Sequence, residues 1–184
     1  MAHREVHISV DCETSGSVPG IYSLLTLGAC VVDDDSKAFS ASFKPISEAF
    51  ELDAMKVNGL DLADLAVNGM EPEEALVAFA TWISSVLGTD GVPVFVGLAA
   101  AFDWQFVNWY FLRFFGTNPF GFAPLDIKAL YMGAFGVPWQ ETRSSLMDKR
   151  LGMTLAPDHS ALGDARYQAE LFRRIMAHIA ARAD

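Results

Sequence analysis

The chain has 184 residues, 52% of them hydrophobic and 20% charged, and its formal net charge is −10 at pH 7. This composition excludes a disordered chain, and the length suits one globular domain, which we expect to span residues 1–184. The negative charge argues against a protein that grips long nucleic-acid duplexes through a basic surface.

Neither a secretory signal nor a membrane-spanning segment is expected. Residues 1–5 carry no apolar segment behind a positive start, and the longest nearly apolar run, residues 92–102, is too short to cross a bilayer. We therefore expect a cytoplasmic protein. Cys12 and Cys30 lie in apolar runs and are expected to be buried; the sequence neither requires nor excludes a disulfide between them.

Three successive strands are predicted at residues 7–11, 24–33 and 38–43, each rich in Val, Ile, Leu, Phe or Thr. Turn residues at 16–20 and 33–36 separate them, which indicates an antiparallel meander. The second turn contains the acidic run 33–35, which we expect to be an exposed hairpin tip, because three successive strand residues cannot face one point.

Helical signals begin at Glu71 and Pro72, after which apolar residues repeat at three and four up to Val86. A buried strand is predicted at 94–98, followed by a helix over 102–115 with apolar residues on nearly every side. We expect this helix to be buried in the core; a contact with another subunit is the alternative.

The last third of the chain predicts a short strand at 123–126, a helix at 127–135, a loop and a final helix. An apolar stripe on the final helix is expected to pack on the sheet: Leu162, Ala165, Ala169, Phe172, Met176 and Ile179. Strands first, and then strands interleaved with helices, indicate an α/β fold with a mixed sheet flanked by helices.

Asp11 and Glu13 point to the same side of the first strand, because side chains alternate faces with a period of two. A divalent cation between them would relieve their repulsion. The alternative is a pair of exposed acids that end a strand.

Two further acids and a histidine lie at helix starts. Asp103 enters the helix after the 94–98 strand, Asp164 enters the final helix, and His159 precedes it. Each acid taken alone is more often a helix cap, and a lone loop histidine often has no role. The order and spacing of all these residues along the chain indicate a shared site more strongly than any one of them does.

Three motifs carry a family resemblance: Val10-Asp11-Cys12-Glu13-Thr14, Ala101-Phe102-Asp103 and His159-Ser160-Ala161-Leu162-Gly163-Asp164. With them the chain resembles, over about residues 7–179, the DEDDh exonucleases of the ribonuclease H-like superfamily. That group includes the proofreading subunit of bacterial DNA polymerase III, ribonuclease T and oligoribonuclease. The sister DEDDy class has a tyrosine four residues before the last Asp, where this chain has Ser160, so the histidine class is favoured.

The resemblance implies a ribonuclease H-like mixed β-sheet, in which an antiparallel meander is joined by parallel strands and flanked by helices. It also implies metal-dependent hydrolysis at the 3′ end of single-stranded or short RNA or DNA, with release of nucleoside 5′-monophosphates. Two Mg²⁺ or Mn²⁺ ions would be bound by a set of four acids, with the first as the bridging ligand: Asp11, Glu13, Asp103 and Asp164.

The same resemblance assigns the remaining site residues. His159 would be the general base for the attacking water, because imidazole titrates near neutral pH. By similarity, Thr14 would contact the terminal nucleotide. Apart from the resemblance, several aromatic residues could stack on a terminal base, although most such residues belong to a core: Phe102, Trp104, Tyr22 and Trp139. Relatives often carry a His-Asn pair where this chain has Leu98 and Ala99, which puts substrate positioning in doubt.

Several alternatives stay open at this stage. The chain could be a non-catalytic exonuclease-fold module that binds nucleic-acid ends or protein partners, or a phosphodiesterase for dinucleotides. A homodimer through the aromatic 102–115 helix is a hypothesis. The sequence does not predict the choice between RNA and DNA, the length or sequence of the substrate, or the biological pathway.

Overall fold

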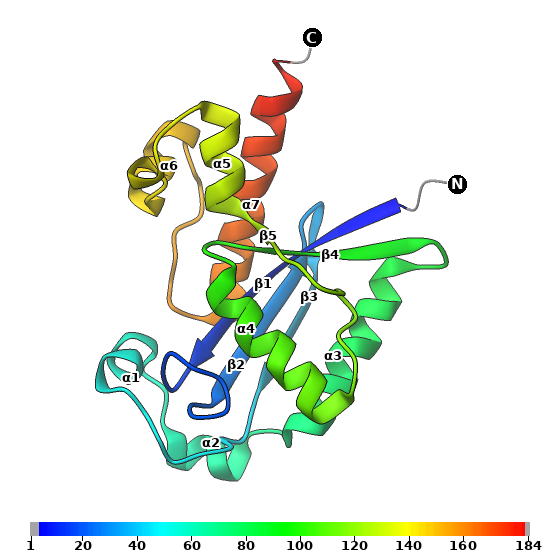
Figure 1. Ribbon diagram of the computed structural model, residues 1–184, viewed down its shortest axis with the longest axis vertical. Helices are drawn as coiled ribbons and strands as arrows, with labels where there is room; N and C mark the ends of the chain where they lie inside the picture. Colours follow the sequence, from blue (N-terminus) through cyan, green and yellow to red (C-terminus); the bar gives the residue numbers. More distant parts are fainter. Residues whose placement is uncertain (1–3, 183–184) are drawn as a thin grey trace.

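The computed structural model describes residues 4–182, with a mixed five-stranded sheet at its centre (Figure 1). The strands lie in the order β3-β2-β1-β4-β5. The pairs β1–β2 and β2–β3 are antiparallel, and the pairs β1–β4 and β4–β5 are parallel. The bounds are β1 Arg4–Thr14, β2 Leu24–Val31, β3 Asp34–Ser42, β4 Gly91–Gly97 and β5 Leu125–Asp126.

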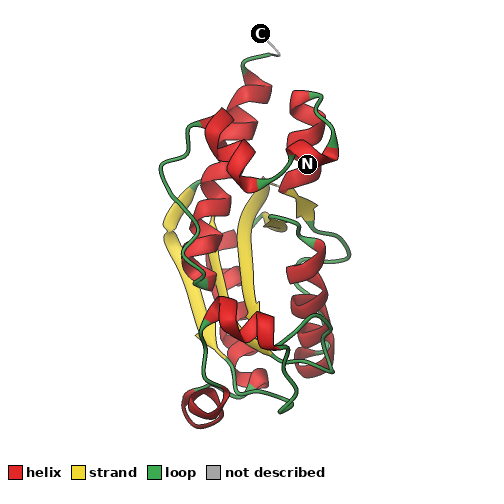
Figure 2. Cartoon of the chain, turned by 90° about the vertical axis from the view of Figure 1, so that its left-hand side faces the viewer, coloured by secondary structure: helices red, strands yellow, loops and turns green. Residues whose placement is uncertain are grey.

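Helices cover both faces of the sheet (Figure 2). α3 and α4 contribute to the hydrophobic core on one face, whereas α5, α6 and α7 contribute to the core on the other. The bounds are α1 Leu52–Asn58, α2 Leu62–Asn68, α3 Pro72–Leu87, α4 Ala101–Tyr110, α5 Ile127–Phe135, α6 Ser144–Leu151 and α7 Ala161–Ala180. The expected ribonuclease H-like arrangement of meander, parallel strands and flanking helices is present.

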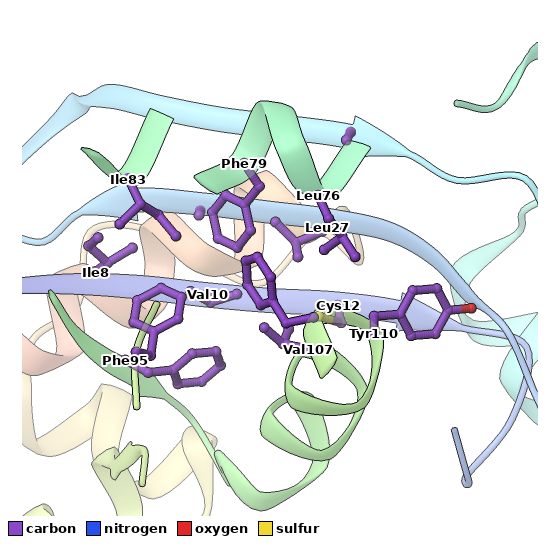
Figure 3. Close-up of a cluster of buried hydrophobic side chains, with 14 of the residues drawn as sticks. Ile8, Val10, Cys12, Leu27, Leu76, Phe79, Ile83, Phe95, Val107 and Tyr110 are labelled. Atoms are coloured by element: carbon purple, nitrogen blue, oxygen red, sulfur yellow. The ribbon is translucent and has the colours of Figure 1, made fainter. Parts of the chain in front are cut away.

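The central strand β1 determines which way the predicted site faces. Ile8, Val10 and Cys12 point into the core that contains Phe79 of α3 and Val107 of α4 (Figure 3). Because side chains alternate along a strand, the residues between them face α7. Asp11 and Glu13 are therefore on the α7 side of the sheet.

The predicted hairpin tip is wrong in part. The turn is formed by residues 32 and 33, and β3 already begins at Asp34. Asp35 is in the strand, where its carboxylate pairs with Arg173 of α7 at 3.3 Å. This ion pair compensates an acid that is otherwise unfavourable in a strand.

The final helix is confirmed, but one of its predicted sheet contacts is wrong. Met176 is 41% exposed, and Ile175 is fully buried in its place. α7 packs against α5 and α6 as well as the sheet, so its buried side is wider than a single stripe and is displaced toward Ile175.

The aromatic helix is shorter than predicted. α4 ends at Tyr110 and continues as the π-helical turn η1, Phe111–Phe115. The expected core burial holds for Phe106 and Phe111, whereas Leu112 and Phe115 remain exposed.

Two further expectations concern the cysteines and the membrane. Cys12 and Cys30 are buried, and both are free thiols. Within residues 4–182, no helix combines the length and the apolar content needed to span a membrane.

Candidate active site

Three carboxylates meet on the α7 side of the sheet. Asp11 and Glu13 come from β1, and Asp164 comes from the first turn of α7. One oxygen from each lies within 4.8 Å of the others. The structure therefore brings together three of the four acids predicted as metal ligands, from segments far apart in the sequence.

The fourth acid, Asp103, is not among the three that converge, but it contacts the strand that bears two of them. It lies in the first turn of α4 and is 4% exposed. Its Oδ1 accepts a hydrogen bond of 3.0 Å from the backbone N–H of Cys12, the residue between Asp11 and Glu13. β1 stops pairing with β4 after Ser9, which leaves this N–H free for a side-chain acceptor.

The acids carry more negative charge than their surroundings compensate. None of the ion pairs among the described residues includes any of the four. Burial, followed by the Asp164 charge, raises the pKa of Glu13 to about 7. Burial raises the pKa of Asp103 to about 8 and, with the three neighbouring acids, raises the pKa of Asp11 well above its usual range. A cation bound here would remove this repulsion.

His159 is near the acids but is not one of the converging group. It is exposed, and it lies in the loop that leads into α7, with a left-handed φ of 60°. The adjacent backbone N–H of Asp158 donates to Asp164 Oδ1 at 2.9 Å, so the loop is tied to one of the acids. His159 and Glu13 line the same hollow.

Glu170 of α7 holds the beginning of the loop that joins α6 to α7 through hydrogen bonds. Its carboxylate accepts hydrogen bonds from the backbone N–H groups of Thr154 and Leu155 and pairs with Arg174. Burial acts to raise the pKa of Glu170, but these donors outweigh it and hold that pKa at about 2. The histidine-bearing loop is thus exposed but anchored at both of its ends.

Two hollows flank the acids, and Glu13 lines both. The larger, of about 600 Å³, is lined by His159, by residues 26–27 of β2 and by residues 40–42 of β3. The smaller, of about 370 Å³, is lined by Thr14, Phe102 and residues of α1. Both volumes lie in the range of small-molecule sites.

The two residues predicted to bind substrate differ in how available they are. Phe102 is 40% exposed at the start of α4. Thr14 is buried, and its hydroxyl donates to the carbonyl of Gly16 at 2.8 Å. Its own carbonyl accepts from the Asn58 side chain at 3.1 Å.

Comparison with known proteins adds evidence that is independent of this geometry. No family model matches the chain. The Escherichia coli protein named 3′-5′ DNA exonuclease Cap18 is 52% identical over 172 residues, which cover 94% of this chain and 92% of that protein. The chain belongs to the DEDDh 3′–5′ exonuclease family. It is accordingly a 3′–5′ exonuclease, as the sequence predicts.

Solved structures agree with this membership at the level of the fold. The nuclease domain of 3′hExo, described as a DEDDh family member bound to rAMP, superposes with a TM-score of 0.79 at 16% identity and covers 96% of this chain and 94% of that chain. Escherichia coli Exonuclease I in complex with a dT13 oligonucleotide gives a TM-score of 0.72 at 16% identity, over 98% of this chain and 42% of that one. The predicted ribonuclease H-like exonuclease fold is confirmed.

Sequence reasoning missed two residues of this DEDDh site. Gln168 of α7 donates to Asp11 Oδ1 at 2.6 Å. Gly28 of β2 is opposite Asp11 in the strand register and lies against the backbone of α7. A glycine inside a strand can indicate a close backbone approach, so Gly28 carried a weak signal. Gln168 carried none beyond its place one turn after Asp164.

Proposed function

We propose that this exonuclease shortens single-stranded DNA from its 3′ end and releases nucleoside 5′-monophosphates, with two divalent cations bound at its acids. The observation that carries the proposal is the convergence of Asp11, Glu13 and Asp164 within 4.8 Å, between two hollows. Asp103 completes the set through its contact with the strand that bears the first two acids.

The donor set fits a hard cation. Every proposed ligand is a carboxylate, and Mg²⁺ and Mn²⁺ prefer oxygen ligands of this kind. Burial raises the pKa of Glu13 and of Asp103, and the charge of Asp164 raises both further, which supports a bound cation as the compensating charge. Bound cations would activate the attacking water and stabilise the leaving 3′ oxygen.

The remaining roles follow from the positions of the side chains. Asp11 interacts with the charges of the other three acids and is the residue proposed to help bind both cations. His159 is the proposed acceptor of the water proton, since it lines the same hollow as Glu13 and is free of burial. Thr14 and Phe102 are proposed to hold the terminal nucleotide in the smaller hollow, with the exposed ring stacked on its base.

The preference for DNA is proposed from the similar proteins. The relative with 52% identity is named a DNA exonuclease. A structural neighbour described in 3′-end recognition of histone mRNA stem-loop is only 16% identical, so its substrate has less bearing on this chain.

The test is a ladder assay on 5′-labelled single strands. DNA and RNA of the same sequence, and a dinucleotide, are incubated with Mg²⁺, with Mn²⁺ or with EDTA. We expect stepwise shortening of DNA from the 3′ end that requires metal and that Asp11→Asn slows by at least about a hundredfold, because it removes a ligand charge.

The matched control is Asp33→Asn, the same change at the exposed hairpin turn, which should keep the wild-type rate. Faster cleavage of RNA would contradict the DNA preference, and cleavage of the dinucleotide alone would favour the small phosphodiester substrate. Shortening that persists in EDTA would contradict the metal mechanism. A homodimer and a cytoplasmic location stay predictions.

A further inference from the structure

Gln168 contacts the proposed active site although no motif includes it. It lies in α7, one turn after Asp164, and is 3% exposed. Its side-chain amide makes two hydrogen bonds. The Nε2 group donates to Asp11 Oδ1 at 2.6 Å, and Oε1 accepts from the backbone N–H of Leu98 at 2.9 Å.

The orientation of this amide is determined by its two partners. The Leu98 N–H can only donate, so the amide oxygen must face it. The amide nitrogen then faces Asp11, whose ionised carboxylate can only accept. Rotation of the amide by half a turn would lose both bonds inside a buried site, where unpaired polar groups are costly. The donor is therefore held in one direction, toward Asp11.

A neutral donor suits this position. Burial and the charges of Asp103, Asp164 and Glu13 raise the pKa of Asp11, and the Gln168 hydrogen bond acts against them. A Lys or Arg would give a stronger bond, but its charge would neutralise the acids and compete with a metal cation. An amide orients the carboxylate and leaves the negative charge of the site in place.

The second partner of the Gln168 amide, Leu98, lies in a segment that is itself held by hydrogen bonds. It follows the last residue of β4, in the short connection that leads to α4 and Asp103. A second side chain anchors the same connection, since the Ala100 N–H donates to Asp126 Oδ2 at 2.7 Å. Asp126 has no hydrogen bond to the acids among the described residues, so it offers a way to separate the two roles.

We propose that Gln168 is a positioning residue that holds the Asp11 carboxylate in the orientation needed to bind a divalent cation. The inference rests on the proposed function, in which Asp11 is a metal ligand. Hydrogen-bond partners of metal ligands commonly contribute 10-fold to 100-fold to metal affinity or activity.

The first test is Gln168→Met, which keeps the length of the side chain and removes both hydrogen bonds. Calorimetric titration of the metal-free protein with Mn²⁺ should show binding weakened about 10-fold to 100-fold. In the exonuclease assay the half-saturating Mn²⁺ concentration should rise by a similar factor, with the KM for the oligonucleotide unchanged. Excess Mn²⁺ should restore most of kcat, and the Tm of the metal-free variant should stay close to that of wild type, which excludes a folding defect as the cause of the weaker binding.

Two further variants keep the proposal falsifiable. Gln168→Glu can still accept from Leu98 but, as a carboxylate, cannot donate to Asp11, and we expect a kcat at least about tenfold lower. Asp126→Ala loosens the Leu98 to Ala100 connection without touching Asp11, and should keep wild-type Mn²⁺ affinity. The proposal is overturned if Gln168→Met binds Mn²⁺ as wild type does, if Gln168→Glu keeps the wild-type rate, or if Asp126→Ala weakens binding as much as Gln168→Met.

Mn²⁺ binding and DNA shortening by Asp164→Asn, measured in parallel, distinguish a failure of this inference from a failure of the proposed function. A wild-type chain that binds Mn²⁺ but does not shorten DNA contradicts the proposed function, and its Mn²⁺ titrations still decide the role of Gln168. If the wild-type chain shortens DNA, Asp164→Asn does not, and Gln168→Met binds Mn²⁺ as wild type does, the role of Gln168 alone is contradicted.

Discussion

Among residues 4–182, two residues other than glycine have a left-handed backbone, and each lies just before a helix that carries a site acid. Ala99 has φ 57° before α4, and His159 has φ 60° before α7. His and Asn adopt this region more readily than other side chains do, whereas Ala gains nothing there. Ala99 occupies a place where DEDDh relatives often have Asn. The departure noted in the sequence is therefore a position of backbone strain, of about 1 kcal/mol.

We predict that Ala99→Asn stabilises the protein. The side chain is exposed, so Asn fits without a steric cost, and it should add about 1 kcal/mol to the free energy of unfolding, or about 2–4 °C to Tm. The control is Ala101→Asn, the same change in the right-handed first turn of α4, which should cost about 0.5 kcal/mol. Thermal unfolding of both variants decides the point. Equal losses of Tm would show that the backbone at position 99 is unstrained.

At the scale of elements, the site depends on how closely α7 approaches β2. Gly28 is the strand partner of Asp11, and a Cβ at this glycine would lie 2.2 Å from the backbone carbon of Ala161. No side chain fits in that space. The first turn of α7, which carries Asp164, can reach the acids of β1 only because position 28 is a glycine.

We predict that Gly28→Ala damages the site without changing any of its acids. The added methyl group must push α7 away from the sheet, which should cost about 1–3 kcal/mol and separate Asp164 from Asp11. Misplacement of this kind should lower the exonuclease rate by about tenfold to a hundredfold. Urea unfolding and the DNA ladder assay measure the two effects.

Gly133→Ala provides the comparison within α5. No atom lies within 4 Å of a Cβ built there, so this variant should be neutral or more stable by about 0.5–1 kcal/mol. Wild-type activity in Gly28→Ala would show that the close approach of α7 is not needed to assemble the site.

At the scale of the whole molecule, the sequence predicts those features of the site that depend on residues close together in the chain. Asp11 and Glu13 share a face through strand alternation, and Asp103 and Asp164 occupy helix starts that their neighbours already indicate. The roles of these acids stay predictions. Gln168 could not be found in this way, because its contact with Asp11 joins residues 157 apart in the chain.

The short helices were missed for a different physical reason. α1 and α2 have seven residues each, and Leu65 is the one buried residue in the two, so neither helix is long enough to show a sustained apolar stripe. The predicted hairpin tip at residues 33–35 was wrong in part, because the ion pair between Asp35 and Arg173 depends on α7, which the hairpin sequence does not reveal.

We expect the clustered acids to make the stability of the whole protein depend on pH and on bound metal. Without metal, the pKa values of Glu13 and Asp103 are about 7 and about 8, above their ordinary values of 4.5 and 3.8. The folded state therefore binds these protons more tightly than the unfolded state does. The resulting stability is fully present below about pH 4 and is lost as the pH rises through 7 and 8. We predict that the Tm of EDTA-treated protein falls between pH 5.5 and pH 8, and that Mg²⁺ raises Tm more at pH 8, where the ligands are ionised.

Asp164→Asn separates this explanation from a general effect of charge. The Asp164 carboxylate is one cause of the raised pKa of Glu13, Asp11 and Asp103, and the amide keeps an oxygen that can accept from the Asp158 N–H. The variant should therefore lose less Tm than wild type between pH 5.5 and pH 8 in EDTA, and should gain less from Mg²⁺. It would be inactive yet more stable at pH 8 without metal, because the repulsion that weakens the empty fold is what attracts the cations. Equal slopes of Tm against pH in the two proteins would place the source of the pH dependence outside the acidic cluster.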